Sequence, residues 1–185
     1  MESISSSCSF RKVVFLLQIF IFFEAHRFCA ADPTYGFTLV QLNGVEKFWI
    51  YNHDKPFRKH NPTRPRSEIR ISGYDHTFGV WQFEGNFLVP QGTSGATIMQ
   101  IFGSPKQATT LQLGVYNGDL KYYRGNVLAA NVQQVVTVFI NGERKLITKD
   151  HGRAAFYFKY GVYGALYHSS NYMQSSWRGI KLYKK

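Results

Sequence analysis

The sequence predicts an all-β fold, an antiparallel jelly-roll β-sandwich of two packed sheets. Beyond Asp32, short runs rich in Val, Ile, Thr, Phe, Tyr and Trp are broken by Gly, Asn, Asp and Pro, and helical periodicity is nowhere sustained. Asn117-Gly118 and Asn141-Gly142 each stand between alternating apolar runs, which predicts two hairpins with type I′ turns. Roughly a dozen strands in one domain require two sheets that cover each other's apolar faces. The predicted strands are 37–42, 47–52, 68–72, 78–90, 96–102, 110–115, 120–124, 135–140, 144–148, 156–163 and 177–183.

Residues 1–31 have the composition of a signal peptide. Two basic residues precede the apolar run 13–23, which is shorter than the roughly 18 residues that span a bilayer. Cys29-Ala30-Ala31 supplies small residues for cleavage. We therefore expect residues 32–185 to form one soluble domain without a membrane anchor. The expected location is the secretory pathway, ending at the cell exterior and wall or in the vacuole.

The chain has a strong excess of positive charge. It contains 22 Lys and Arg residues against 11 Asp and Glu residues, a formal net charge of +11 at pH 7. This excess favours acidic partners such as a polyuronate or a small carboxylate. Nucleic acid is not an expected partner, because the chain has a secretory signal and no motif of a known nucleic-acid module. We expect a monomer.

No metal or other cofactor is expected. Both cysteines lie within residues 1–31, so the domain that follows has no disulfide. The six histidines are scattered along the chain without the spacing of metal ligands. The domain must therefore be held together by packing alone.

The motif Arg66-Ser67-Glu68-Ile69-Arg70 predicts a charged row on one face of a strand. Alternate side chains of a strand share a face, so Arg66, Glu68 and Arg70 point the same way. Two arginine forks can bind an anion while the glutamate orients them and reduces their mutual repulsion. A solvated row of salt bridges is the alternative, and the motif alone leaves both interpretations open.

The same alternation predicts polar positions on two other strands. Gln100 shares a face with Phe102, and Lys159 shares a face with Tyr163. If these faces line one cleft with the arginines, they supply an amide, an ammonium group and a phenol, which suit a carboxylate ligand. The alternative is that these residues only decorate the surface of a sheet.

Three motifs, in this order along the chain, resemble the signature strands of the alginate lyase 2 family, also known as polysaccharide lyase family 7. They are Arg66-Ser67-Glu68-Ile69-Arg70, Gln100-Ile101-Phe102 and Tyr157-Phe158-Lys159-Tyr160-Gly161-Val162-Tyr163. The segments 63–70, 79–85, 89–95 and 177–181 look still more like a plant branch of that family, the citrate-binding proteins. The resemblance covers nearly all of the chain beyond residue 31 and implies the jelly roll of that family.

The resemblance also implies roles for individual residues. β-Elimination of a uronate chain requires a group that neutralises the carboxylate, a base and an acid. By position, Arg66, Arg70 and Gln100 would hold the carboxylate, and Lys159 would add positive potential nearby. The candidate ligand-binding residues are Arg66, Glu68, Arg70, Gln100, Lys159 and Tyr163.

The resemblance breaks at the catalytic base. Phe102 stands where the lyases have a histidine, and phenylalanine has neither a lone pair nor an exchangeable proton. The first hypothesis is therefore a protein that binds citrate or a uronate carboxylate without turnover. The alternative is a polyuronate lyase in which Tyr163 acts as both base and acid in a syn elimination. A third hypothesis is a non-enzymatic protein held on cell-wall polysaccharide by its net charge.

Two stretches are short for the family. One lies between Leu42 and Gly44, and the other lies between Asn131 and Val135, where the resemblance implies a long strand. A lost strand leaves its neighbours with unpaired edges. We therefore expect a chain that is less stable than its full-length relatives.

Overall fold

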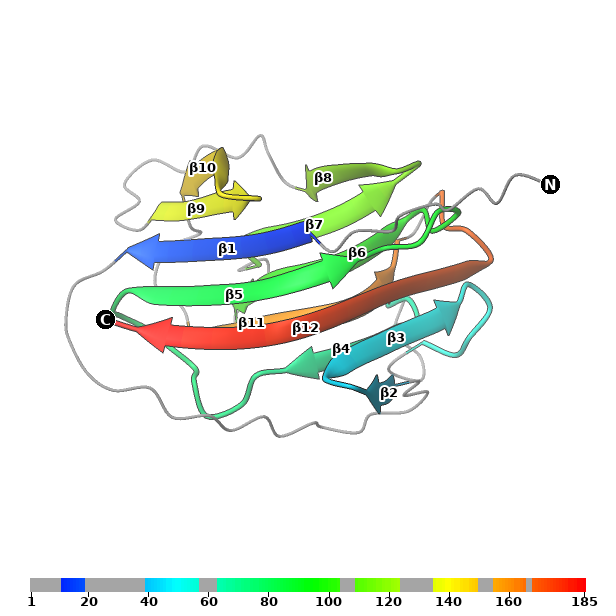
Figure 1. The fold of residues 1–185 in the computed structure, drawn as a ribbon, viewed down its shortest axis with the longest axis horizontal. Coiled ribbons are helices and arrows are strands. Elements are labelled where there is room, and N and C mark those ends of the chain that lie inside the picture. The colour runs from blue at the N-terminus through cyan, green and yellow to red at the C-terminus, as the bar shows by residue number, and fades with distance from the viewer. Residues whose placement is uncertain are drawn as a thin grey trace.

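The computed structural model describes residues 11–18, 39–56, 63–103, 109–123, 135–149, 155–165 and 168–185. These residues form strands joined by turns, and none of them is helical (Figure 1). The strands are β1 (Arg11–Gln18), β2 (Leu39–Leu42), β3 (Val45–Tyr51), β4 (Arg66–Arg70), β5 (Trp81–Leu88), β6 (Ala96–Gly103), β7 (Leu111–Tyr116), β8 (Asp119–Tyr123), β9 (Val135–Ile140), β10 (Glu143–Lys149), β11 (Phe156–Gly164) and β12 (Tyr172–Lys184).

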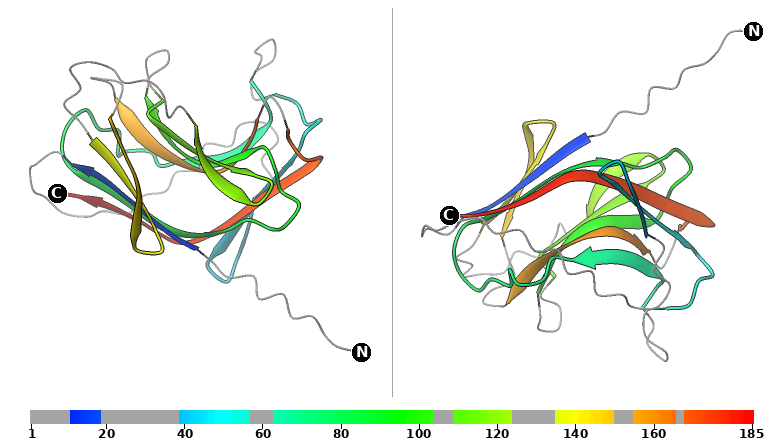
Figure 2. Two further views of the ribbon diagram at one scale, coloured as in Figure 1. Left: turned by 90° about the horizontal axis from the view of Figure 1, so that it is seen from above. Right: turned by 60° about the horizontal axis from the view of Figure 1, so that its bottom comes forward.

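The strands form two antiparallel sheets that pack face to face. One sheet has seven strands in the order β10-β9-β1-β5-β12-β3-β2, and the other has five in the order β4-β11-β6-β7-β8. Both layers bend in the same direction, and the five-stranded sheet lies on the inner side of the bend (Figure 2). The predicted all-β sandwich is confirmed.

Aromatic side chains from both sheets form the core. In β11, alternate residues are buried, and Tyr160 is among them. The Tyr160 ring centroid lies 5.6 Å from that of Trp177 and 5.9 Å from that of Phe83, both in the seven-stranded sheet. The Tyr160 hydroxyl donates to Glu46 Oε2 at 2.7 Å, so its polar end is satisfied within the sandwich. This packing fixes which face of β11 points outward.

The predicted hairpins are confirmed by their backbone angles. Asn117 and Gly118 have φ of 51° and 85°, and Asn141 and Gly142 have φ of 53° and 81°. Type I′ turns need positive φ at both central residues, which asparagine and glycine tolerate best. A third pair, Asn43 and Gly44, has φ of 52° and 72° and joins β2 to β3. The stretch that is short for the family thus closes as a tight hairpin.

Each predicted strand has an observed counterpart, with differences at the ends, and residues 37, 38 and 124 of the predicted strands lie outside the described residues. The largest difference is in β12, which begins at Tyr172 although the sequence predicts a start at Trp177. The sequence pattern did not indicate a strand at Ser175 and Ser176, because buried polar residues break the alternation of apolar and polar residues that predicts a strand. The Ser175 hydroxyl donates to the Gly161 carbonyl at 2.6 Å, which satisfies it inside the core.

β1 was not expected, because it comes from the segment assigned to the signal peptide. It pairs with β5 on one side and β9 on the other, and Phe15 lies opposite both Phe83 and Val138, which are buried. Its run of Val, Phe and Leu suits a strand with neighbours on both sides. The expectation that residues 1–31 lie outside the fold therefore differs from the structure at 11–18. Cleavage of the segment stays a prediction.

Removal of residues 1–31 should destabilise the domain. It would leave the facing edges of β5 and β9 without their partner, and unpaired edges favour self-association. We expect the chain 32–185 to melt at a lower temperature than the chain 1–185 and to form oligomers on size-exclusion chromatography. Mass spectrometry of the protein after expression in cells that process signal peptides would identify which form exists. Equal melting temperatures would contradict the structural role of β1.

His76 is a buried histidine that lies among aromatic rings. Its ring stacks on Trp81 with centroids 4.9 Å apart and lies 5.5 Å from Phe158. Nδ1 lies 3.2 Å from the Tyr74 carbonyl oxygen, which can only accept, so Nδ1 carries the proton of the neutral ring. Burial lowers the pKa of His76 from 6.5 to about 4.

Stability should therefore depend on pH through His76. Between pH 6.5 and about 4, the unfolded chain binds a proton at this residue that the folded protein does not bind. We expect the free energy of unfolding to fall as the pH drops through this window, by at most about 3 kcal/mol, with no further loss from this group below it. Urea unfolding at a series of pH values measures the effect. His76→Phe keeps an aromatic ring and should flatten the curve, and an unchanged curve would rule out this cause.

Candidate functional site

Polar side chains line up across the outer face of the five-stranded sheet. The strand register places Arg70 opposite Lys159, Lys159 opposite Gln100, and Gln100 opposite Gln112. Residues directly opposite in antiparallel strands share a face and lie within reach of each other. Strands far apart in the sequence thus contribute to one line of donors, and we call these four residues together with Arg66, Glu68 and Tyr163 the polar row.

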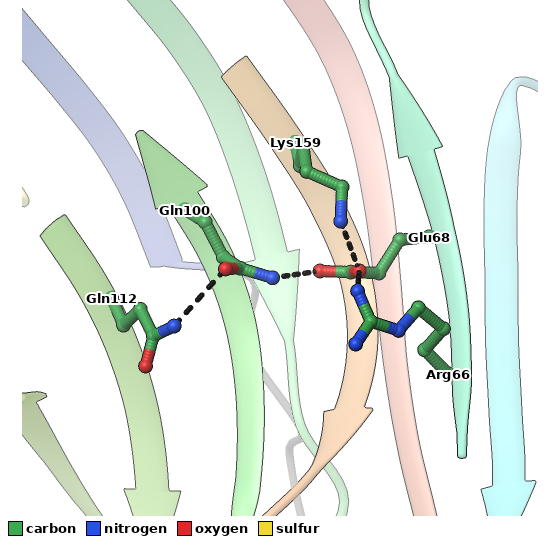
Figure 3. A network of polar contacts seen from close by, with 5 residues as sticks. All are labelled: Arg66, Glu68, Gln100, Gln112 and Lys159. Atoms are coloured by element: carbon green, nitrogen blue, oxygen red, sulfur yellow. Dashed lines mark hydrogen bonds and ion pairs between the residues drawn. The ribbon is translucent and has the colours of Figure 1, made fainter. Parts of the chain in front are cut away.

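Glu68 is the centre of the polar row (Figure 3). Its side chain is only 3% exposed, and its Oε2 accepts from Lys159 Nζ at 2.5 Å and lies 3.6 Å from Arg66 Nη1. Its Oε1 accepts a short hydrogen bond from Gln100 Nε2. A buried carboxylate needs such partners to offset its lost hydration. The sequence predicted that Glu68 orients the arginines, and the structure shows that it also holds the lysine and the amide.

Gly161 allows β4 and β11 to approach each other at this point. It lies opposite Glu68 and has a φ of 137°, which only glycine adopts easily. A Cβ on Gly161 would lie 2.3 Å from the Ser67 carbonyl oxygen and 2.8 Å from Glu68 Cα. Since Gly161 has no side chain, the Glu68 carboxylate meets no side chain directly across the ladder. It leans instead toward Lys159 and Gln100.

Gln112 is a member of the polar row that the sequence analysis missed. Its Nε2 donates to Gln100 Oε1 at 3.1 Å, while Gln100 Nε2 donates to Glu68 (Figure 3). Both ends of the Gln100 amide are therefore committed, and its orientation is fixed. The alternation of polar Gln112 between buried Leu111 and Leu113 was the signal that could have identified it.

The two arginines each lie over a tyrosine ring. Arg66 Cζ is 4.2 Å from the ring centroid of Tyr163, and Arg70 Cζ is 3.9 Å from that of Tyr157. Such stacking holds a guanidinium in a fixed plane while leaving its edge for hydrogen bonds. Burial raises the pKa of Tyr157, with the Arg70 charge acting in the opposite direction. Tyr157 is therefore a neutral platform for Arg70 at physiological pH.

Arg70 also pairs with Asp75, which the sequence did not single out. The Arg70 guanidinium and the Asp75 carboxylate form a close ion pair, with both side chains about two-fifths exposed. The polar row together with Asp75 thus contains three cations and two carboxylates. One positive charge remains in excess, which is a much weaker field than the arginines and the lysine would produce alone.

Phe102 occupies the position expected for a catalytic base. The centroid of the Phe102 ring lies 5.3 Å from that of the Tyr157 ring and 5.7 Å from Lys159 Nζ. It therefore faces the same side of the sheet as Lys159 and Gln100, as predicted. The ring contributes an apolar surface at this end of the row but cannot transfer a proton.

The described residues show neither a metal-binding cluster nor a membrane-spanning helix. No cluster of three or more His, Cys, Asp or Glu side chains there could hold a metal ion. No helix in that part of the chain is long and apolar enough to cross a membrane.

The chain has relatives in sequence and in structure. The family model described as alginate lyase matches residues 32–134. A citrate-binding protein of Hevea brasiliensis is 46% identical over 213 residues, which cover 96% of this chain and 88% of the relative. Since the aligned length exceeds the 185 residues of this chain, the relative has residues without a counterpart here, in line with the short stretches noted in the sequence.

Solved structures share the fold at low sequence identity. The alginate lyase AlgAT5 of polysaccharide lyase family 7 matches with a TM-score of 0.61 at 13% identity, over 84% of this chain and 88% of its own. An alginate lyase of Corynebacterium sp. matches with a TM-score of 0.56 at 15% identity, over 94% of each chain. At such identities the likeness concerns the fold alone, and it confirms the jelly-roll architecture.

Glu68→Gln should destabilise the protein. The substitution keeps the size of the side chain but removes the charge that offsets Lys159 and Arg66, which leaves two partly buried cations uncompensated. We expect the free energy of unfolding to fall by about 3 kcal/mol in urea denaturation. Glu143→Gln is the matched control, because the Glu143–Lys145 ion pair is exposed, and we expect no measurable change there. Equal effects of the two substitutions would contradict a structural role for Glu68.

Proposed function

The chain belongs to the alginate lyase family, and we propose that it is a carboxylate-binding member whose ligand is citrate or the carboxylate of a uronate. The support from relatives is the 46% identical Hevea brasiliensis protein, which is named for citrate binding. The support from the site is the polar row, which combines two stacked guanidinium groups with an ammonium group and two amides. Donors of these kinds bind carboxylates through charge-assisted hydrogen bonds.

The observation that carries the proposal is the fixed geometry of the row around Glu68. Lys159 and Gln100 are both held by this buried carboxylate, and Arg66 is held by it and by the Tyr163 ring. Because the donors are held in place before a ligand arrives, little conformational entropy is lost on binding. The single excess positive charge selects anions without making the face indiscriminately basic.

The replacement of the catalytic histidine by Phe102 favours binding over turnover. A lyase that abstracts a proton with an imidazole needs a basic nitrogen at this position, and phenylalanine has none. We therefore propose that this chain does not cleave guluronate.

A polyuronate lyase that uses Tyr163 alone is the second candidate. The observation that favours it is the position of the Arg66 guanidinium 4.2 Å from the centroid of the Tyr163 ring, which places the phenol beside a group that can bind the uronate carboxylate. Such an enzyme would perform syn elimination on mannuronate or glucuronate and release unsaturated, ultraviolet-absorbing ends. We expect no growth of ultraviolet absorbance on incubation with either polymer. A steady increase that Tyr163→Phe abolishes would establish the enzyme instead.

A wall-associated protein held only by its net charge is the third candidate. In that case every cation contributes alike, and binding follows ionic strength rather than the identity of the residue. The location that we propose is the secretory pathway, with the cell exterior or the vacuole as destination. This proposal rests on the composition of residues 1–31.

Arg66→Ala tests the proposed site. We expect the substitution to weaken citrate binding at the row at least tenfold in calorimetric titration, because a charge-assisted contact and a stacked guanidinium are both lost. Arg144→Ala removes the same charge from exposed β10 of the other sheet and should leave the affinity unchanged. Equal small losses in both variants would favour the charge-held wall protein. Absence of heat with citrate and with a mannuronate oligomer in the wild type would exclude the proposed function.

A further inference from the structure

A cavity of about 200 Å³ lies just beyond the polar row. Pro65 and Gly164 are part of its wall, and each is next in sequence to a member of the row, since Pro65 precedes Arg66 and Gly164 follows Tyr163. The bond from Gly164 N to the Pro65 carbonyl at 3.0 Å continues the ladder of β4 and β11 to this point. None of the side chains of the row lines the cavity, so it is a separate space.

The polar lining of the cavity consists of groups that can donate hydrogen bonds. Asn52, Arg64 and His168 contribute them, while the Ser169 hydroxyl donates to the Ala165 carbonyl at 2.8 Å, and no carboxylate is among the described residues of the wall. The Asn52 side-chain amide has two N–H groups, and one of them donates to Asn171 Oδ1 at 3.0 Å. A guanidinium has five N–H donors, enough to keep a protein contact and hold a carboxylate as well. The described wall of the cavity thus carries the guanidinium of Arg64 and no carboxylate, whereas two carboxylates lie within or beside the polar row.

One wall of the cavity is held rigidly. Ser170 N donates to the Ser94 carbonyl at 2.9 Å, and Ser94 N donates to Ser170 Oγ at 3.0 Å. Ala165 N donates to the Gly95 carbonyl at 2.7 Å. A Cβ on Gly95 would lie 2.6 Å from Ser169 Cα, so only glycine allows the two segments to come so close. These contacts fix the backbone that carries His168.

His168 has a left-handed backbone conformation. Its φ is 60°, in the left-handed region that non-glycine residues seldom adopt. Its side chain is exposed at the edge of the cavity and is not part of the core. Unfavourable backbone conformations persist only where the surroundings enforce them, and they concentrate at binding sites. The fold therefore holds an imidazole at the mouth of the cavity at some cost to stability.

We propose that this cavity is a second binding site, specific for a small organic acid with two or more carboxylates. Arg64 holds one carboxylate through its guanidinium, and Asn52 and His168 donate to another. The volume is below the roughly 300–1,000 Å³ of pockets that hold larger ligands, so the cavity suits a small acid better than a sugar chain. The site is independent of the polar row. The row lies on the open outer face of the five-stranded sheet, where a polymer can be accommodated.

Citrate, used as the probe, tests the proposal by calorimetric titration of the full chain. We expect two citrates per wild-type chain and one per chain in Arg64→Gln, with at least a tenfold loss of affinity at the cavity. His168→Gly should weaken the same site and preserve the fold, because glycine readily takes a φ of 60°. Arg66→Ala should remove the other citrate and leave the cavity site intact. A mannuronate oligomer should compete only for the site that depends on Arg66.

The outcomes separate the cavity from the row. Two citrates bound with unchanged affinity in both Arg64→Gln and His168→Gly would overturn the cavity site, whatever happens in Arg66→Ala. A single citrate in the wild type that is lost only in Arg66→Ala would overturn it as well, and so would a wild type that binds no citrate. Thermal unfolding of each variant checks the fold. If Arg64→Gln alone unfolds, the result from His168→Gly decides.

Discussion

The structure depends on the packing of alternate β11 residues against the seven-stranded sheet. Phe158, Tyr160 and Val162 are buried between the layers, and Tyr160 contacts Trp177 and satisfies its hydroxyl there. Side chains of a strand alternate, so burying these residues sends Lys159 and Tyr163 to the outer face. A shift of β11 by one residue would bury the lysine and expose the aromatic rings. The free energy of burying these apolar side chains would be lost, so this register is strongly disfavoured. The position of the polar row is therefore a consequence of the core.

Within the row, the pairing of β11 with β4 places the buried carboxylate of Glu68 among cations. Gly161 lets β4 lie close to β11, and Glu68 then reaches Lys159 and Gln100. The result is a face whose donors are held in fixed positions and whose charge is nearly balanced. Such a face recognises an anion by geometry more than by net potential, which fits a selective binder better than a general polyanion surface. The cavity beside it has Arg64, and no carboxylate, among the described residues of its wall.

The seven-stranded sheet raises a different question about the N-terminal segment. The residues that resemble the start of a signal peptide also form β1, which joins β9 and β10 to the rest of the sheet. An apolar run of Val, Phe and Leu satisfies both roles, because a translocation signal and a central strand both require uninterrupted hydrophobicity. One molecule cannot lose the segment and keep the strand. A processed form, if cleavage occurs, would leave two edges open or need another strand to cover them.

The sequence by itself determined the class of fold, the hairpins and most of the row. Alternation identifies Arg66, Glu68 and Lys159 as outward residues, and Asn-Gly pairs specify turns through local backbone sterics. Only the tertiary structure decided which of these residues meet, since Glu68 lies 32 residues from Gln100 and 91 from Lys159. Such contacts depend on the order of strands in a sheet, which no local pattern encodes. For the same reason the roles of Gln112 and Asp75, the cavity and the place of β1 emerged only when distant segments were brought side by side.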